Sequence, residues 1–455
     1  MSARELQSAR AVAAQTLQRF DPACDYAGTI LDPLLSQTDE RQRATDLVCG
    51  TIRNLHAIDA VIARFSGRRP DRIAPALLSI IRVGIYELAY SPATPVYSIV
   101  NEAVNNARKA GGRKQTGFVN AVLREIVRHL ANREAQPAAS NPRRTLIREP
   151  GTGCEFDTDL LPDPAISPAE YLSTCFSLPL WLVRDWLDAF GPDQTRQVCL
   201  GSNRRPSLYI RVNLLRTTAQ DLLARLEQAG IKAEIVPDMT LDLLRITSPH
   251  AVTELPGFSE GLFTVQDLSA SQAVRVLQPQ PGWTILDMCS APGTKTTQIA
   301  ELTQDSATIL ATDIDPERLK RVQENIARLG LMSITIIPYT QLAHGTVGPF
   351  DAILLDVPCS NTGVLARRIE ARYRLRPETI HDLAAIQRTL LEKAAALLKP
   401  SGRICYSTCS IQKPEDQDVI RDFLATHKQF KLACEQLTLP SLAPFDHDGA
   451  YMAIL

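Results

Sequence analysis

One stretch, Leu286–Thr296, constrains the fold of this chain more than any other. It reads Leu-Asp-Met-Cys-Ser-Ala-Pro-Gly-Thr-Lys-Thr, overlaps the end of the apolar run Trp283–Leu286 and leads into a helix-like segment, Thr297–Leu302. A strand, a loop of small residues and a helix N-terminus in this order form the geometry in which an α/β sheet binds a cofactor at its carboxyl edge. Pro292-Gly293 fixes one dihedral angle and frees the next, so the backbone can approach a ligand closely.

Two common nucleotide-binding motifs do not fit this loop. A P-loop requires Gly-Lys-Ser/Thr, whereas Gly293 is followed by Thr294. A dinucleotide fingerprint requires three spaced glycines, and the loop has only one. Taken alone, the loop leaves two interpretations open: a cofactor site, or an ordinary connection between a strand and a helix.

Length and composition limit the class of protein. The chain has 455 residues, of which 45% are hydrophobic and 22% charged, and its net charge is −1. Because single cores rarely grow past about 250–300 residues, we expect two or three domains. This composition excludes mainly disordered and fibrous proteins. No apolar run approaches the roughly 20 residues of a membrane span, and the N-terminus does not resemble a signal peptide, so a cytoplasmic protein is expected.

The ten cysteines are scattered, with no CxxC pair and no metal-ligand spacing among the Cys and His residues. In a reducing cytosol disulfides are not expected, so each cysteine serves either packing or chemistry. The sequence predicts no metal site.

The chain divides into regions of different pattern. Residues 1–134 carry apolar residues three and four apart, which predicts a helical bundle, with breaks at Asp21-Pro22, Asp32-Pro33, Gly67 and Gly111-Gly112. Residues 135–168 are rich in Pro, Ser, Asn, Asp and Gly without any period, which predicts a linker or a loosely held insertion. Residues 169–258 mix helices with short strands such as Leu241–Ile246, which predicts a small α+β subdomain.

Basic residues gather in both of the structured regions before residue 259. A surface that contacts RNA and an ordinary solvated surface explain them about equally well. The two groups are Arg64, Arg68, Arg69, Arg72, Arg108, Lys109, Arg113 and Lys114, and then Arg204, Arg205, Arg211 and Arg216.

From residue 259 onward strands and helices alternate with short connections, which predicts an α/β fold with a parallel sheet covered by helices on both faces. The expected strands are Ile285–Met288, Ala307–Thr312, Ser333–Ile337, Ala352–Asp356 and Arg403–Ser407. The expected helices are Thr296–Leu302, Pro316–Leu329, Thr379–Leu398 and Pro414–His427.

Polar residues follow three of these strands, at the edge where such a sheet places its site. Asp313 can accept both hydroxyls of a ribose, whereas Asp315 precedes Pro316 and suits a helix N-cap. Asp356 is followed by a rigid turn and the thiol of Cys359, and a second thiol, Cys409, follows the last strand. A thiolate beside a carboxylate suits addition to C6 of a pyrimidine, which makes C5 nucleophilic toward a sulfonium methyl donor.

These motifs resemble the NOL1/NOP2/Sun family of RNA cytosine-C5 methyltransferases. The resemblance rests on Asp287–Thr296, Asp356–Ser360 and Ser407–Ser410, and extends to Val265–Ala270, Arg211–Arg216 and Asp448–Ala453. The N-terminal part is similar to NusB-type RNA-binding domains through Gly50–Arg53, Leu78–Tyr86 and Phe118–Arg124. This combination is the layout of the bacterial 16S rRNA methyltransferase B (Fmu/Sun) type.

The resemblance implies a fold and a division into domains. It implies a Rossmann-like class I methyltransferase domain, preceded by an all-α NusB-like domain and a small α+β RNA-binding subdomain. We therefore expect a NusB-like domain over 1–134, a linker over 135–168, the subdomain over 169–258 and the methyltransferase domain over 259–455.

The resemblance also implies roles for individual residues. S-adenosylmethionine would lie over Cys289, Ser290, Ala291, Pro292, Gly293, Thr294 and Lys295, with Asp313 on its ribose and with Thr340 and Asp356 completing the cofactor site. Cys409 would be the nucleophile on C6, Cys359 would help to release the product, and Asp356 would orient the cytosine. Lys295 would assist near the reacting ring. The basic segment Arg367–Tyr373 would contact RNA.

The chain departs from the family pattern at two positions of the cofactor site. The family carries an Asp after its third strand that meets the adenine amine, and Pro338–Gln341 offers none, which leaves Thr340 or a backbone group as a substitute. Thr294 stands where the family has a second glycine.

The leading hypothesis is an S-adenosylmethionine-dependent enzyme that makes 5-methylcytosine in 16S rRNA or its precursor, as a monomer without membrane contact. Three alternatives remain: methylation of another RNA, DNA cytosine methylation with the Pro-Cys thiol as nucleophile, and a non-catalytic RNA-binding factor in ribosome assembly.

Overall fold

The computed structural model describes residues 6–237, 242–248, 250–343, 347–442 and 444–455. The chain forms two compact units. The first contains Met1–Arg204 together with the later segment Leu365–Leu375, and the second contains Arg205–Val364 and Arg376–Leu455. Among the described residues, no helix is both long enough and apolar enough to cross a membrane.

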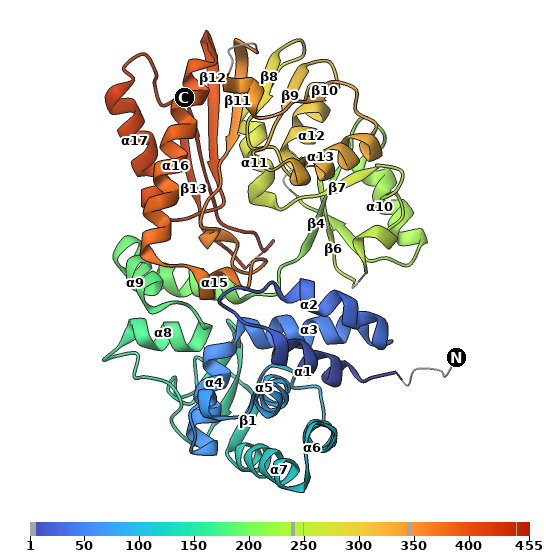
Figure 1. The fold of residues 1–455 in the computed structure, drawn as a ribbon, viewed down its shortest axis with the longest axis vertical. Coiled ribbons are helices and arrows are strands. Elements are labelled where there is room, and N and C mark those ends of the chain that lie inside the picture. Colours follow the sequence, from blue (N-terminus) through green and yellow to red (C-terminus); the bar gives the residue numbers. More distant parts are fainter. Residues whose placement is uncertain (1–5, 238–241, 249, 344–346, 443) are drawn as a thin grey trace. The chain divides into compact units, whose positions relative to one another are not determined.

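The first unit begins with a helical bundle (Figure 1). Its helices are α1 (Ala9–Arg19), α2 (Ala27–Leu34), α3 (Arg41–Arg53), α4 (Leu55–Ser66), α5 (Pro75–Tyr90), α6 (Val96–Ala110) and α7 (Arg113–Arg128), with short 3-10 turns at Leu35–Gln37 and Pro70–Arg72. Buried apolar residues of α1, α2, α3 and α5 share one core. The bundle confirms the prediction that the N-terminal region is all-α.

The predicted helix breaks are correct at three of four places. α1 ends before Asp21-Pro22, Gly67 caps α4 in the left-handed conformation, and Gly111-Gly112 separates α6 from α7. At Asp32-Pro33 the prediction is wrong, because α2 runs through Pro33 to Leu34. Since Pro33 lies in the last turn of the helix, its missing N–H removes only one hydrogen bond.

A small sheet lies where the sequence predicted the end of the helical bundle and the irregular segment 135–168. Its strands β1 (Leu130–Ala135), β2 (Thr145–Glu149) and β3 (Thr152–Phe156) pair antiparallel in the order β1-β3-β2. Cys154 and Phe156 on β3 are buried, so this cysteine is a core residue. Strands of five residues between Pro- and Asn-rich turns are too short to show a period in the sequence.

Helices α8 (Pro168–Phe176) and α9 (Leu180–Asn203) also belong to the first unit. α9 is kinked where Gly191 adopts a positive φ of 74° ahead of Pro192. The first unit continues to Arg204, the residue after α9, and the second unit begins at Arg205. The proposed four-part division into domains stays a prediction.

The segment Leu365–Leu375, which contains the short helix α15 (Ala371–Arg374), is built into the first unit. Arg372 is 1% exposed and donates hydrogen bonds to the carbonyl oxygens of Arg53, Phe176, Ser202 and Leu365 and to Oδ1 of Asn203. The hydroxyl of Tyr373 donates to the carbonyl oxygen of Ile52 at 2.5 Å. These two side chains therefore point into the protein, which contradicts the expectation that they contact RNA.

The second unit is organised around a seven-stranded sheet in the order β10-β9-β8-β11-β12-β14-β13. Its strands are β8 (Thr284–Asp287), β9 (Thr308–Ala311), β10 (Ile334–Ile336), β11 (Phe350–Asp356), β12 (Leu398–Thr408), β13 (Cys434–Thr438) and β14 (Ala450–Ile454). The first five strands of this order are parallel, as predicted, whereas β14 pairs antiparallel with both β12 and β13 at one edge. The unit thus has the predicted Rossmann-like fold with a mixed sheet.

Helices cover both faces of this sheet (Figure 1). α16 (Pro377–Ala396) and α17 (Gln417–Thr426) share one core with the sheet, and α11 (Leu268–Leu277), α12 (Thr294–Leu302) and α13 (Pro316–Leu329) share another. The short helix α14 (Thr340–Ala343) follows β10, and 3-10 turns lie at Thr362–Val364 and Lys413–Glu415. The carboxyl ends of β8, β9, β11 and β12 meet at one edge, because parallel strands end on the same side.

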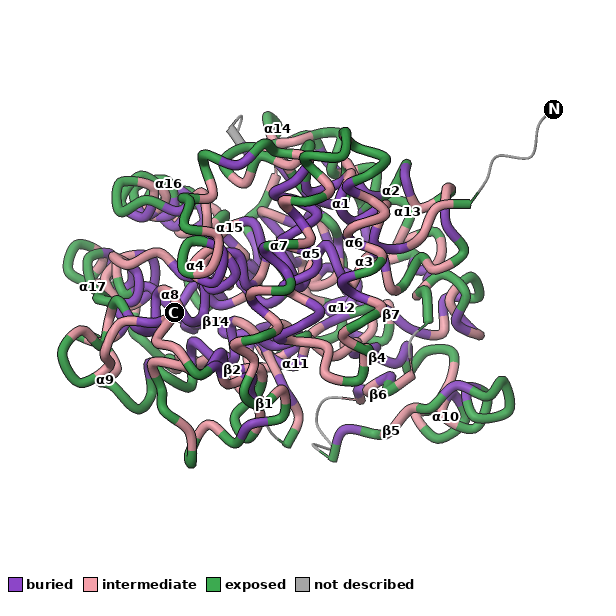
Figure 2. The backbone as a smooth tube through the Cα atoms, turned by 90° about the horizontal axis from the view of Figure 1, so that it is seen from below, coloured by how far each residue is buried: buried purple, intermediate pink, exposed green. Residues whose placement is uncertain are grey.

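A four-stranded antiparallel sheet in the order β5-β6-β4-β7 forms the predicted α+β subdomain. The strands are β4 (Leu208–Val212), β5 (Ala233–Ile235), β6 (Leu243–Ile246) and β7 (Phe263–Val265), with α10 (Ala219–Gln228) and a 3-10 turn at Val252–Glu254. The predicted strand Leu241–Ile246 corresponds to β6, and its first residue, Leu241, lies outside the described residues. Figure 2 shows most of α10 as exposed or intermediate, since it buries only Leu222 and Leu226.

Candidate active site

The loop after β8 begins with a buried carboxylate. Asp287 ends β8, is 1% exposed, and accepts a hydrogen bond of 2.6 Å from the hydroxyl of Thr296 at its Oδ2. Burial raises the pKa of Asp287 to about 7, and the nearby Asp356 carboxylate acts in the same direction. This carboxylate therefore ionises in the physiological range, which is unusual for an aspartate.

Glycine is required at one position of this loop. Gly293 has a φ of +97°, and a Cβ there would lie 3.1 Å from Cγ1 of Val322. Its N–H donates to the carbonyl oxygen of Ser290 at 2.6 Å, while the N–H of Ser290 donates to Thr312 at 2.9 Å. Thr294, in place of a second glycine, is simply the first residue of α12.

Three buried polar atoms around this loop have no hydrogen-bond partner among the described residues: Oδ1 of Asp287, Oγ of Ser290 and Oγ1 of Thr312. Buried polar groups in folded proteins are normally paired, because an unpaired one costs free energy. Their position at the carboxyl ends of β8 and β9 suits a polar ligand at this edge of the sheet.

The carboxylate of Asp313 holds the next part of the loop through two hydrogen bonds. It is 4% exposed, and it accepts hydrogen bonds from the backbone N–H of Ala291 at 3.2 Å and of Asp315 at 3.0 Å. Asp315 caps α13 by accepting from the N–H of Glu317, as the sequence predicted. Thr340, the suggested adenine-side substitute, is exposed at the start of α14.

A lysine and an aspartate pair at the ends of α12 and β11. Nζ of Lys295 lies 2.6 Å from Oδ2 of Asp356, and the hydroxyl of Ser407 donates to Oδ1 of Asp356 at 3.2 Å. Burial lowers the pKa of Lys295, but the charge and the hydrogen bond of Asp356 more than offset this, so the pKa is raised overall. Lys295 therefore remains an ammonium group at neutral pH.

The two predicted thiols are adjacent. The Sγ atoms of Cys359 and Cys409 lie 3.0 Å apart, and the thiol of Cys409 also donates to Oδ1 of Asn361 at 3.2 Å. The hydrogen bond with Cys409, followed by burial, holds the pKa of Cys359 well above its usual value. Asn361 was not predicted as a site residue; its place two residues after Cys359 is the sequence signal that could have pointed to it.

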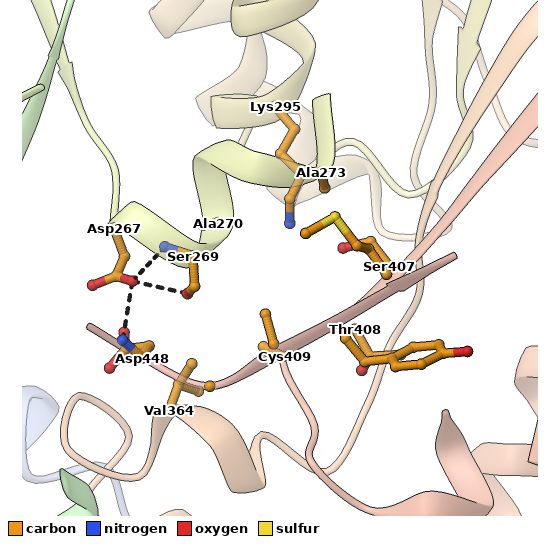
Figure 3. Close-up of a pocket in the computed structure, with 14 residues that line it drawn as sticks. Asp267, Ser269, Ala270, Ala273, Lys295, Val364, Ser407, Thr408, Cys409 and Asp448 are labelled. Carbon is orange, nitrogen blue, oxygen red and sulfur yellow. Dashed lines mark hydrogen bonds between the residues drawn. The ribbon is translucent and has the colours of Figure 1, made fainter. Parts of the chain in front are cut away.

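A pocket lies beside Lys295 and Cys409 (Figure 3). Lys295 of α12 and Cys409 at the end of β12 line it, and at its other end Oδ1 of Asp267 accepts from the N–H and hydroxyl of Ser269 and from the N–H of Asp448. Its further lining residues are Ala270, Ala273, Val364, Ser407, Thr408, Gly449, Ala450, Tyr451 and Met452. Asp267 and Asp448 were missed as site residues, although both lie in segments that carry the family resemblance.

The structure thus brings Lys295, Asp356, Cys359 and Cys409 to one edge of the sheet, and places residues 289–294 and Asp313 along the same edge. The described residues contain no cluster of His, Cys, Asp and Glu that could hold a metal ion.

Arg211, grouped by the sequence with a basic surface, is instead a buried structural residue. It is 2% exposed and bonds both carboxylate oxygens of Glu301 on α12, each at 2.9 Å. It also donates to the carbonyl oxygen of Thr294 at 3.0 Å. Arg211 therefore fastens the subdomain strand β4 to the helix that carries Lys295, and it is not available to RNA.

Comparisons with known proteins agree with this arrangement. The family model of 16S rRNA methyltransferase RsmB/F matches residues 274–449, that of the NusB family matches 7–128, and that of the RsmF/B-like ferredoxin-like domain matches 178–253. A probable ribosomal RNA small subunit methyltransferase B of Synechocystis sp. is 32% identical and aligns over 95% of this chain and 92% of that protein. This chain belongs to the RsmB/F methyltransferase family.

Two further relatives of this RsmB/F-family chain extend the comparison. Ribosomal RNA small subunit methyltransferase B of Serratia proteamaculans is 33% identical over 93% of this chain and 91% of that protein. The crystal structure of PH0851 has a TM-score of 0.73 over 99% of each chain at 24% identity, which supports the fold.

Proposed function

We propose that this chain transfers a methyl group from S-adenosylmethionine to C5 of a cytosine in 16S rRNA or its precursor. The observation that carries the proposal is the pair of thiols, 3.0 Å apart, on the sheet edge that also holds the Lys295–Asp356 pair. Relatives of nearly the same length are named ribosomal RNA small subunit methyltransferase B, which supports the choice of substrate.

The residues at the end of β8 fit such a cofactor. Unpaired polar atoms of Asp287, Ser290 and Thr312 offer acceptors and donors for the methionine and ribose parts, and Asp313 has lone pairs left for ribose hydroxyls. The predicted set for the cofactor is Cys289, Ser290, Ala291, Pro292, Gly293, Thr294, Lys295, Asp313, Thr340 and Asp356. When bound, the cofactor supplies an electrophilic methyl group.

The chemistry of the chain's own residues follows from their pairing. The Cys409 thiolate adds to C6 of the cytosine, and the electron pair of the C5–C6 bond moves to C5, which takes the methyl group. Asp356 accepts the exocyclic N–H of the base and is held by the Lys295 ammonium. Bonding of Cys409 to C6 removes the hydrogen bond that raises the pKa of Cys359, so Cys359 loses its proton to solvent. Its thiolate then takes the C5 proton, the C5–C6 double bond forms again, and the Sγ–C6 bond breaks to return the Cys409 thiolate.

The test uses an rRNA transcript and two single variants. Cys409→Ala should abolish methyl transfer, whereas Cys359→Ala should still form the Sγ–C6 bond and accumulate a covalent protein–RNA adduct that survives denaturing electrophoresis. If the adduct accumulates instead in Cys409→Ala, the Pro-Cys thiol is the nucleophile, as in DNA cytosine methylation. Full turnover by Cys409→Ala would falsify the proposal.

One observation favours a second function, that of a non-catalytic RNA-binding assembly factor. The stretch after β10 lacks the adenine-side acid of the family, and Thr340 there is exposed. Titration calorimetry with S-adenosylmethionine separates the two functions, because an enzyme must bind the cofactor measurably and a non-catalytic factor need not.

A further inference from the structure

A buried carboxylate, that of Glu415, lies beside the two loops that carry the thiols. Glu415 ends the 3-10 turn after β12 and is 0% exposed. Its carboxylate accepts hydrogen bonds from the N–H of Ser360 at 2.8 Å, the hydroxyl of Ser410 at 2.6 Å and Nε2 of Gln387 at 3.1 Å. The hydroxyl of Ser360 donates to it as well. Four donors from three elements therefore converge on one side chain.

Two of these donor residues are the chain neighbours of the thiols. Ser360 follows Cys359 and Ser410 follows Cys409, so Glu415 bonds the residue next to each cysteine. A backbone hydrogen bond also joins the loops that carry the two cysteines: the N–H of Gly363 donates to the carbonyl oxygen of Cys409 at 2.9 Å. Glu415 itself bonds neither thiol in the described structure.

Gln387 and Tyr406 hold Glu415 in place through further hydrogen bonds. Nε2 of Gln387 on α16 donates both to Glu415 and, at 2.9 Å, to the carbonyl oxygen of Pro358, the residue before Cys359. The hydroxyl of Tyr406 bonds Oε1 of Gln387 and the carbonyl oxygen of Glu415. Because Gln387, Tyr406 and Glu415 are all buried, this network has few alternative arrangements.

We propose that Glu415 is a positioning residue that holds the Cys359 and Cys409 loops at the separation the reaction requires. This inference rests on the proposed function for its catalytic meaning, since a nucleophile displaced by about 1 Å can cost on the order of 10²-fold in rate. It predicts that Glu415 acts through Ser360 and Ser410, without contacting the base.

A carboxylate is the side chain that this position needs. It offers four lone-pair sites and no hydrogen, so it can accept from all four donors together. A glutamine has one accepting oxygen. If this oxygen takes the place of Oε1, it keeps the N–H of Ser360 and Nε2 of Gln387, but the NH2 group then faces the hydroxyls of Ser360 and Ser410, which can no longer donate there. Glu415→Gln therefore keeps the volume and loses part of the network, which makes it the informative substitution.

The first measurement reports thiol separation without any methyl transfer. The protein is equilibrated with mixtures of reduced and oxidised glutathione, and the Cys359–Cys409 disulfide is quantified by mass spectrometry of peptides under non-reducing conditions. We expect Glu415→Gln to lower the equilibrium constant for this disulfide at least about tenfold, while the matched control Glu392→Gln, an exposed glutamate on α16, matches the parent protein.

The second measurement is single-turnover methyl transfer to an rRNA transcript. We expect Glu415→Gln to lower the rate about tenfold or more, with the dissociation constant for S-adenosylmethionine unchanged. If Glu415→Gln does not fold, as judged by circular dichroism, Ser360→Ala replaces it. This variant removes the hydroxyl of Ser360 and leaves the other three hydrogen bonds to the Glu415 carboxylate in place.

The outcomes separate this inference from the proposed function. An unchanged disulfide equilibrium in the folded variants overturns the positioning role. If Glu415→Gln lowers the disulfide equilibrium but the parent protein shows no methyl transfer, the positioning role is supported and the proposed reaction is refuted. A lowered rate with an unchanged disulfide equilibrium also counts against positioning, because Glu415 would then act in some other way.

Discussion

The Sγ atoms of Cys359 and Cys409 lie 3.0 Å apart although 50 positions separate these residues in the chain. The register of two neighbouring parallel strands brings them together, since Asp356 of β11 pairs with Ser407 of β12. Cys359 follows Asp356 by three residues and Cys409 follows Ser407 by two, so both thiols leave the sheet at the same edge. Their proximity is therefore a property of the sheet and not of one flexible loop.

Mild oxidation should join these two thiols. Hydrogen peroxide converts two thiols into a disulfide and two water molecules, and the pair is already in van der Waals contact. We expect stoichiometric peroxide to form the Cys359–Cys409 disulfide before any other, to abolish methyl transfer, and to be reversed by dithiothreitol.

The four buried cysteines of the described structure serve as internal controls for this oxidation: Cys154, Cys175, Cys199 and Cys405. Burial raises the pKa of each of these thiols, which makes the reactive thiolate scarce. Peptide mapping should find them reduced. A disulfide between any other pair, formed first, would contradict the observed proximity.

Removing the charge of Asp356 should change the titration of Lys295. In Asp356→Asn the largest contribution that offsets the burial of Lys295 is lost, so we expect the pKa of Lys295 to fall. The measurement is an NMR titration of the lysine ε-carbons, with Lys295→Arg to assign the signal. An unchanged lysine titration would show that the two groups do not pair in solution.

Most of the catalytic edge could be predicted from sequence because two kinds of local pattern coincide there. Alternating apolar runs and amphipathic segments locate β8 to β12 and the helices between them, and α13 has the predicted bounds, Pro316–Leu329. Motifs at the strand ends then single out residues such as Lys295, Asp356 and Cys409. Their roles stay predictions, whereas their gathering at one edge is confirmed.

The elements that were missed depend on contacts distant in sequence. β13 is polar and pairs only with β14, so no apolar alternation marks it. Arg211 and Arg372 look like surface arginines in the sequence. They are buried because Glu301 lies opposite one, 90 positions away, and carbonyl oxygens surround the other. Such partners belong to tertiary structure and leave no local pattern.

Breaking the Arg211–Glu301 pair should destabilise the second unit. Both side chains are nearly buried, at 3% and 6% exposure, and Arg211→Ala leaves Glu301 as an uncompensated buried charge. Removing one partner of a buried pair costs about 3–5 kcal/mol in the free energy of unfolding. Urea unfolding followed by circular dichroism measures this loss.

An exposed pair in the same unit provides the comparison. Arg225 and Glu260 pair at the surface with 42% and 51% of their side chains exposed, so solvent screens their attraction. Arg225→Ala should leave the urea midpoint almost unchanged. If the two substitutions cost the same, the burial of Arg211 is not what stabilises the unit.

Neutralising Asp287 should stabilise the cofactor-free protein at alkaline pH. The folded state binds the Asp287 proton more tightly than the unfolded state, since burial raises the pKa from 3.8 to about 7. Between about pH 4 and pH 7 unfolding therefore releases a proton, and the free energy of unfolding falls as the pH rises. The full penalty, above pH 7, is on the order of 4 kcal/mol.

Asp287→Asn removes this penalty and keeps an oxygen that can accept from Thr296. We expect it to raise the melting temperature at pH 8, and to raise it less at pH 5, where Asp287 is protonated in the folded state and only part of the penalty is present. Asp351→Asn should act in the opposite direction, because hydrogen bonds from Lys399 and from the N–H of Thr284 hold the pKa of Asp351 below its usual value. The stability that Asp351 contributes is present above its unfolded pKa, so its loss appears at pH 8 and fades as the pH falls. Parallel pH-dependent shifts of the two variants would mean that burial does not govern Asp287.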